Sequence, residues 1–308
     1  MTKLTLPARK PFNFTSVVNS HGWRQLAPFS YDEAANSLGY TLQLPTGRVV
    51  QLTLRDGKDG VIVETEKLDR TERRDMLDKV TWMFGLDMDF SRFYAASRAE
   101  PKLAHARRRA LGRVLRSPTV FEDVIKTILT TNTLWSATKN MTRKLVDTFG
   151  ASLLSDGRSV ALEPQMASAP RSEARAFPSP TSIAASSPEF LKEAIRVGYR
   201  APAIHQLAVR VASGELDLES LKTSQIPTLE LRKALMTING VGPYAAANLL
   251  LILGRSDFIP IDSWALKLVS EEWYRGKPIT AREVEKRFAK WGEFKGLAYW
   301  FWDWKYHQ

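Results

Sequence analysis

The clearest chemical signal in the chain is a glycine-rich turn between two apolar stretches. Residues 238–243 read Ile-Asn-Gly-Val-Gly-Pro, and Gly240 and Gly242 allow positive φ and close approach of the backbone to a partner. Pro243 is typical of a first helical turn, and the Ala- and Leu-rich residues 244–253 predict a largely buried helix. Because the start of a helix carries partial positive charge and free N–H groups, this turn is a natural binding site for one phosphate.

A single acidic residue, Asp262, follows this helix after a short loop. It comes directly after an extended apolar segment, residues 258–261, and before residues 263–269, which have helical character. The sequence therefore predicts Asp262 at a helix N-cap, where aspartate contributes about 1 kcal/mol. Such a cap would also hold a carboxylate rigidly at the floor of a cleft.

The turn and the aspartate together resemble the helix-hairpin-helix DNA glycosylase superfamily, whose signature is this hairpin followed by an invariant aspartate. The resemblance implies that the hairpin residues Ile238, Gly240, Val241 and Gly242 hold the DNA backbone near a lesion. It implies that Asp262 is catalytic, stabilising the oxocarbenium-like sugar cation and orienting or activating the attacking water. An ordinary helix–helix connection is the alternative interpretation of the turn itself.

The position that decides between two family chemistries holds a tyrosine. Bifunctional members carry a lysine two residues after the second hairpin glycine, and its amine attacks the sugar to form a Schiff base. Tyr244 occupies that position here. We therefore expect a monofunctional hydrolase that leaves an intact abasic site, without lyase activity.

A second region of resemblance lies upstream. Residues 117–132 look like the helix that opens the catalytic core, and the Thr-Thr-Asn segment ending at Asn132 is similar to the Ser-Ser-Asn of 8-oxoguanine glycosylases. There the asparagine fills the gap left by the flipped base, and a tyrosine, here Tyr199, wedges into the complementary strand. Base flipping needs such a plug and wedge. The alternatives are a turn residue for Asn132 and an ordinary half-buried tyrosine for Tyr199.

Aromatic residues bear on the choice of substrate. Alkylpurine glycosylases of this fold stack a cationic base on an electron-rich pocket, and the aromatic residues that could line one here are Trp82, Phe84, Trp135, Tyr244 and Trp264. The full set expected in the base pocket and duplex wedge is Asn132, Tyr199, Arg200, Tyr244, Trp264 and Trp135. The segment 21–23, His-Gly-Trp, and residues 83–87 are similar to bacterial alkylpurine members, although a folding role also explains them.

We expect a DNA N-glycosylase of base excision repair that acts on damaged, alkylated purines, as 3-methyladenine DNA glycosylases do. An 8-oxoguanine-type glycosylase and a non-catalytic, lesion-sensing DNA-binding module are the alternatives. The retained Asp262 favours an enzyme, because a pure DNA binder gains little from a carboxylate beside phosphates.

The charge balance favours double-stranded DNA as the partner. The chain of 308 residues has 44 Lys and Arg against 33 Asp and Glu, a net charge of +11. Basic residues cluster before the predicted core helix and after the Asn132 loop, at Arg107, Arg108, Arg109, Arg113, Arg116, Lys139, Arg143 and Lys144. A solvated helix face is the alternative interpretation of each cluster.

The chain has no cysteine, which excludes disulfides and the four-cysteine iron–sulfur cluster of two branches of the superfamily. Its four histidines lack metal-like spacing, so we expect no metal and no cofactor, with a monovalent cation at the hairpin left open. No apolar run approaches the ~20 residues that span a bilayer. We expect a monomer without membrane contact, cytoplasmic and nucleoid-associated if the source is bacterial or archaeal.

The elements that must position these residues predict an α+β fold. Residues 40–54 alternate polar and apolar and predict an antiparallel sheet, whereas the pattern is helical from Leu68 on. We expect an N-terminal antiparallel β-sheet domain with a connecting helix (1–97), then an all-α helix-hairpin-helix core (98–308). A flexible Ala/Ser/Pro-rich loop is expected near 155–187. The aromatic C-terminal stretch predicts a helix closing on the core, with a base-binding aromatic box as the less favoured alternative.

Overall fold

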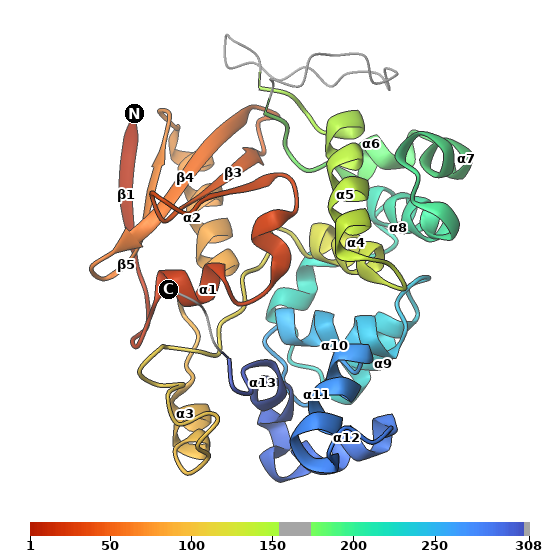
Figure 1. The fold of residues 1–308 in the computed structure, drawn as a ribbon. Helices are drawn as coiled ribbons and strands as arrows, with labels where there is room; N and C mark the ends of the chain where they lie inside the picture. The colour runs from red at the N-terminus through yellow and green to blue at the C-terminus, as the bar shows by residue number, and fades with distance from the viewer. Residues whose placement is uncertain (154–173, 305–308) are drawn as a thin grey trace.

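The computed structural model describes residues 1–153 and 174–304, and it confirms the α+β class (Figure 1). A five-stranded antiparallel sheet has the order β1-β5-β4-β3-β2. Its strands are β1 (Thr2–Pro7), β2 (Phe29–Asp32), β3 (Ser37–Gln43), β4 (Val49–Gly57) and β5 (Gly60–Thr65). The alternation expected over residues 40–54 is thus the β3–β4 hairpin, with Leu42 opposite Val50 and Tyr40 opposite Leu52.

One glycine allows β1 to approach β5 closely. Gly57 pairs with Gly60 across the turn, and a Cβ added at Gly60 would lie 2.0 Å from the carbonyl oxygen of Leu6 on the neighbouring β1. Only glycine therefore allows the edge strand to approach here.

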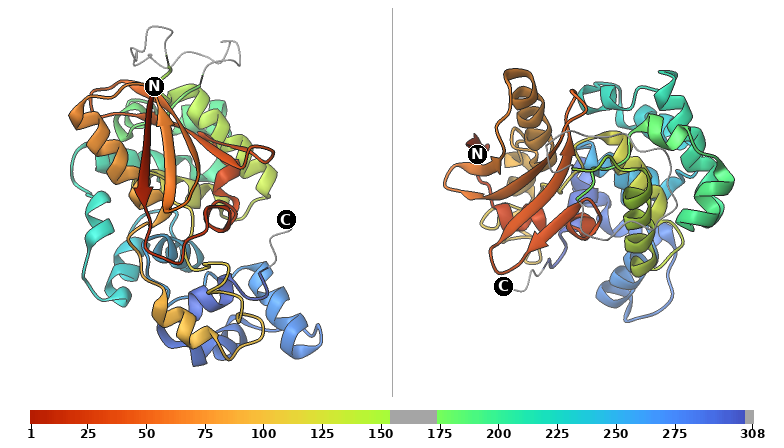
Figure 2. Two further views of the ribbon diagram at one scale, coloured as in Figure 1. Left: turned by 90° about the vertical axis from the view of Figure 1, so that its left-hand side faces the viewer. Right: turned by 90° about the horizontal axis from the view of Figure 1, so that it is seen from above.

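Helix α2 (Arg70–Phe84) lies beside the sheet in all views (Figures 1 and 2). Asp69 and Glu72 form a capping box at its start, with Glu72 N donating to Asp69 at 2.8 Å. The buried Glu72 carboxylate also accepts from Thr46 and Arg48 at 2.9 Å each, which joins the helix to the β3–β4 turn. Short helices α1 (Phe14–Val18), η1 (Gly22–Gln25) and α3 (Ser91–Ser97) complete this part.

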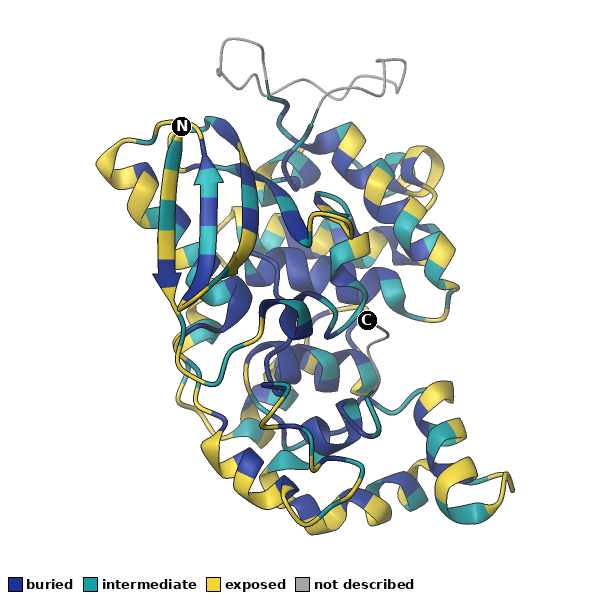
Figure 3. Cartoon of the chain, turned by 60° about the vertical axis from the view of Figure 1, so that its left-hand side comes forward, coloured by how far each residue is buried: buried dark blue, intermediate teal, exposed yellow. Residues whose placement is uncertain are grey.

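The rest of the described chain is helical. Its elements are α4 (Val120–Thr130), α5 (Trp135–Phe149), α6 (Pro180–Ala184), α7 (Pro188–Phe190), η2 (Leu191–Ile195), η3 (Gly198–Arg200), α8 (Ala201–Ala212), η4 (Glu219–Thr223), α9 (Thr228–Met236), α10 (Pro243–Ile252), α11 (Ser263–Tyr274), α12 (Ala281–Phe288), η5 (Ala289–Phe294) and α13 (Lys295–Trp300). Buried residues gather in the middle of the molecule and exposed ones on its outer helices (Figure 3). As expected, α10 is largely buried, and it packs against α4 and α9.

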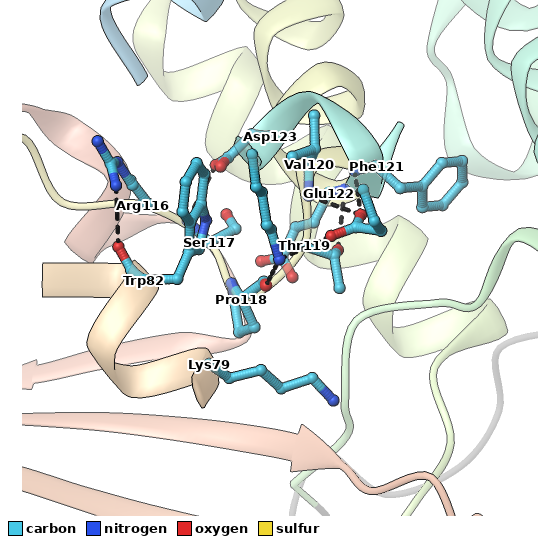
Figure 4. A network of polar contacts seen from close by, with 12 residues as sticks. Lys79, Trp82, Arg116, Ser117, Pro118, Thr119, Val120, Phe121, Glu122 and Asp123 are labelled. Carbon is cyan, nitrogen blue, oxygen red and sulfur yellow. Dashed lines mark hydrogen bonds and ion pairs between the residues drawn. The ribbon is translucent and has the colours of Figure 1, made fainter. Parts of the chain in front are cut away.

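Side chains from a distant segment hold the start of α4. Thr119 caps the helix, and the carboxylate of Glu219 accepts from the backbone N–H of Val120 at 2.8 Å (Figure 4). Lys222 donates to the carbonyl of Pro118, also at 2.8 Å. These contacts fix the helix whose other end leads into the Asn132 loop.

The expected loop at 155–187 is only partly open to comparison, because residues 154–173 lie outside the described residues. In the remainder, Pro180–Ala184 forms α6, with Ser179 as its N-cap and Pro180 at its first position. The prediction of a loop is therefore wrong for this stretch. Proline at the first helical position favours a helix, a preference that the Ala/Ser/Pro-rich composition alone does not reveal.

Two arginines of the expected basic cluster are buried instead of exposed to a partner. Arg113 donates to the carbonyl groups of Gly85, Pro11, Arg9 and Met88. Arg116 lies 4.1 Å from the ring centroid of Trp82 and donates to its carbonyl at 3.3 Å. Both join the end of α2 to neighbouring segments, so they cannot contact DNA directly.

Candidate functional site

The hairpin between α9 and α10 leaves backbone amides without side-chain partners at the start of α10. Val241 N donates to Ile238 O at 3.0 Å, and Gly240 has φ of 85°, in the region that favours glycine. Gly242 is the N-cap of α10, and no side chain caps this helix. Residues at its start line an open groove, so the positive end of the helix faces a place that an anion can reach.

Asp262 is the N-cap of α11, as the sequence predicts. Its Oδ1 accepts from Ala265 N at 2.9 Å, and the backbone of Asp262 itself is extended. The hydrogen bond fixes the side chain by one oxygen. The carboxylate of Asp262 is consequently held in one orientation.

Asp262 stands where an inner cavity meets the outer groove. The cavity has a volume of about 270 Å³, and the groove of about 910 Å³ contains the hairpin, Asn132 and Tyr199. The residues that line both are Thr130, Thr133, Tyr244 and Asp262. A group that enters the cavity from the groove therefore passes the carboxylate.

Aromatic side chains from widely separated segments wall the cavity. Trp23 and Trp135 contribute from η1 and α5, Tyr244 from α10 and Trp300 from α13. Trp135 donates its indole N–H to Gln25 at 3.0 Å. It packs so closely over Gly22 that a Cβ added there would lie 2.3 Å from its ring. Electron-rich rings of this kind attract a cationic base.

The charge of Asp262 acts on the tyrosines near it. Burial, and then the Asp262 carboxylate, raise the pKa of Tyr244. The same two causes raise the pKa of Tyr299. Tyr244 is thus a neutral phenol at any physiological pH, and it offers no amine for a Schiff base.

The predicted plug and wedge residues meet at the groove. Asn132 adopts φ of 45°, and its amide donates to the hydroxyl of Tyr199 at 3.4 Å. Tyr199 is 65% exposed, unusual for so large a side chain, and the Arg200 guanidinium lies 4.5 Å from its ring centroid. Arg200 lines the same groove but is only 7% exposed, because its guanidinium donates to the carbonyls of Thr131 and Asn132. It supports the Asn132 loop and does not extend toward a duplex.

Three aromatic residues expected in the base pocket lie elsewhere. Trp264 is 62% exposed: with Asp262 at the N-cap, the helix turns Ala265 inward and Trp264 outward. Phe84 is fully buried against Phe14, with ring centroids 5.4 Å apart, and Trp82 packs under Arg116. The expectation that these three residues line the base pocket is wrong. The residue type predicts that a side chain can stack, but it does not predict which side of its helix the side chain occupies or what it packs against.

Sequence reasoning missed other cavity residues. Asn248, one turn after Tyr244 on α10, lines the cavity, as do Thr138 and Trp300. The helical spacing from Tyr244 could have identified Asn248. The C-terminal stretch forms α13 as expected, yet Trp300 also lines the cavity, as in the less favoured aromatic-box alternative.

Within residues 1–153 and 174–304, no three His, Asp or Glu side chains gather as metal ligands would. None of the helices in the same ranges is both long and apolar enough to cross a membrane.

Several known proteins are similar to this chain in sequence or in fold. DNA-3-methyladenine glycosylase of Bacillus subtilis is 25% identical over 207 residues, which cover 66% of this chain and 63% of that protein, so the match spans less than two thirds of the relative. A solved structure of MBOgg1 with a low-affinity DNA ligand is 26% identical, with a TM-score of 0.70 and coverage of 98% and 94%. The 3-methyladenine DNA glycosylase of Archaeoglobus fulgidus shares the fold, at 21% identity, a TM-score of 0.72 and coverage of 98% and 97%.

The family model described as HhH-GPD superfamily base excision DNA repair protein matches residues 125–294. This range is more than half of the chain and includes the hairpin, Asn132, Tyr199 and the capping residue Asp262. The chain belongs to the HhH-GPD superfamily of base excision DNA repair proteins.

Proposed function

We propose that the protein is a monofunctional DNA glycosylase that hydrolyses the N-glycosidic bond of damaged, alkylated purines flipped out of duplex DNA. The observation that carries this proposal is the position of Asp262, a carboxylate fixed at the junction between an aromatic cavity and a groove lined by hairpin amides. The name of the Bacillus subtilis relative supports the same activity.

In the proposed reaction the flipped base enters the cavity while its sugar stays beside Asp262. As the glycosidic bond lengthens, positive charge develops on the sugar, and the fixed carboxylate stabilises it without reorganising. The free oxygen of Asp262 orients water toward the anomeric carbon. The hairpin amides at the start of α10 hold a neighbouring phosphate, which keeps the sugar in register.

The aromatic walls support alkylated purines over other lesions. A purine methylated on its ring carries positive charge and already has a weakened glycosidic bond, so stacking and one carboxylate suffice for its removal. The rings of Trp23, Trp135, Tyr244 and Trp300 supply that stacking. We further propose that no cofactor takes part and that the protein acts on DNA as a monomer in the cytoplasm. A monovalent cation bound at the hairpin stays a prediction.

An 8-oxoguanine-type activity is the second candidate. The meeting of Asn132 and Tyr199 at the groove favours it, because this pairing resembles the plug and wedge of that branch. The absence of an amine at residue 244 argues against the lyase step of that branch.

Product analysis tests the proposal. Duplexes carrying either a methylated purine or 8-oxoguanine are incubated with the protein and divided into samples with and without hot alkali. We expect release of the methylated base, strand breaks only after alkali, and no protein–DNA adduct trapped by borohydride. Release of 8-oxoguanine with spontaneous strand cleavage would reverse the assignment.

A further inference from the structure

His21 places a polar ring inside the aromatic cavity. It lines the cavity together with Asp262, and its ring lies 4.5 Å from that of Trp23 and 6.0 Å from that of Trp300, centroid to centroid. Simple stacking does not require a histidine there, since phenylalanine would stack as well. Stacking therefore does not explain why this residue is a histidine, and its ring nitrogen atoms must be considered.

A hydrogen bond fixes the tautomer of this ring. Nε2 lies 2.5 Å from the carbonyl oxygen of Leu115, and because a carbonyl only accepts, Nε2 carries the proton. Burial lowers the pKa of His21 to about 4, so the ring is neutral at neutral pH. Nδ1 then holds a free lone pair, and no described residue donates a hydrogen bond to it.

The other ring nitrogens around the cavity are already occupied. The indole N–H of Trp23 donates to Asp123 at 2.7 Å, that of Trp135 to Gln25 at 3.0 Å and that of Trp300 to Ser20 O at 2.9 Å. None of them can recognise the edge of a base without breaking a bond. His21 Nδ1 is accordingly the ring nitrogen of the described cavity wall that stays open to accept from the edge of a base.

We propose that His21 Nδ1 accepts a hydrogen bond from an N–H group on the edge of the flipped purine and thereby favours bases that carry an amino donor. The inference rests on the proposed glycosylase function and names one residue that sets its specificity. A neutral acceptor also suits a cationic base, because it adds no positive charge beside it. An adenine methylated on its ring keeps its exocyclic amino group, whereas 1,N6-ethenoadenine has no N–H at that nitrogen.

Single-turnover rates on these two substrates test the inference with two variants. His21→Phe keeps an aromatic ring and removes the acceptor, while His21→Gln can donate to Leu115 O and still present an oxygen. We expect His21→Phe to slow release of methylated adenine about tenfold, the value of one hydrogen bond, and to leave ethenoadenine release nearly unchanged. His21→Gln should retain most of the wild-type ratio between the substrates.

Equal slowing on both substrates in His21→Phe, with a lower midpoint of thermal unfolding, would mean that His21 is structural and would overturn the inference. An unchanged ratio in both variants would overturn it as well. If the wild-type protein releases neither base, the proposed function itself fails. That outcome is distinct from a wild type that works and a His21 variant with unaltered selectivity.

Discussion

Replacement of Asp123 by asparagine should change how the stability of the protein depends on pH. Asp123 lies fully buried in the first turn of α4, where its Oδ1 accepts from Trp23 Nε1 at 2.7 Å and from Ser117 N at 3.0 Å. Its other oxygen, Oδ2, is buried without a hydrogen-bond partner among the described residues. Burial accordingly raises the pKa of Asp123 to about 7.

The size of the effect follows from proton linkage. In the unfolded chain the acid ionises near pH 3.9, so between about pH 4 and 7 the folded state holds a proton that the unfolded state has lost. Stability contributed by the protonated acid is thus complete below pH 4 and is lost as pH rises to 7. Each pH unit between the two pKa values is worth about 1.4 kcal/mol, so the rise from pH 5 through the folded pKa to pH 8 removes roughly 3 kcal/mol.

Asparagine at this position does not titrate, and its carbonyl oxygen can still accept from Trp23 and Ser117. The free energy of unfolding of Asp123→Asn minus that of the wild type should therefore grow by roughly 3 kcal/mol between pH 5 and 8. Urea unfolding at four pH values measures this difference. Because His21 titrates in both proteins, its opposite contribution cancels. A difference that stays constant with pH would refute a protonated, buried Asp123.

Three further predictions concern the groove. Gly240→Ala should cost about 1–2 kcal/mol of stability, because Gly240 has φ of 85° and an added Cβ would lie 3.2 Å from Ala203. Gly242→Ala has open space around it and loses only the N-cap preference of glycine, so this control should cost less than about 1 kcal/mol. Equal unfolding midpoints would contradict this. Tyr199→Ala should keep the wild-type midpoint of unfolding but slow base release from duplex DNA at least tenfold, since stacking on a base is worth about 1–3 kcal/mol. Full activity of this variant would rule out Tyr199 as the wedge. DNA binding should weaken steeply with salt, and a flat response would argue against phosphate contacts.

The parts of the site that local sequence determines were predictable. The hairpin glycines, the capping of α11 by Asp262 and the end of α4 near Asn132 each depend on residues close together in the chain. Propensities for turns and caps operate over this range. Alternation over residues 40–54 likewise predicted the β3–β4 hairpin.

Long-range packing accounts for what the sequence did not reveal. The cavity brings together both ends of the chain: Trp300 donates to the carbonyl of Ser20, 280 residues away. No local pattern encodes that contact. The charge of Arg113 suggested a DNA contact, yet its burial among backbone carbonyls depends on two distant segments, residues 9–11 and 85–88. Trp264 has the expected residue type but is exposed on its helix instead of lining the cavity.

The most direct test of Asp262 as the catalytic carboxylate is base release from a duplex carrying methylated adenine, by wild type and Asp262→Asn side by side. Asparagine is an equally good N-cap, so the variant should keep its unfolding midpoint and its binding to DNA with an abasic analogue. We predict release by wild type and a rate about 10²–10³-fold lower for the variant. Equal rates, or a variant that unfolds and no longer binds DNA, would contradict a catalytic role for Asp262.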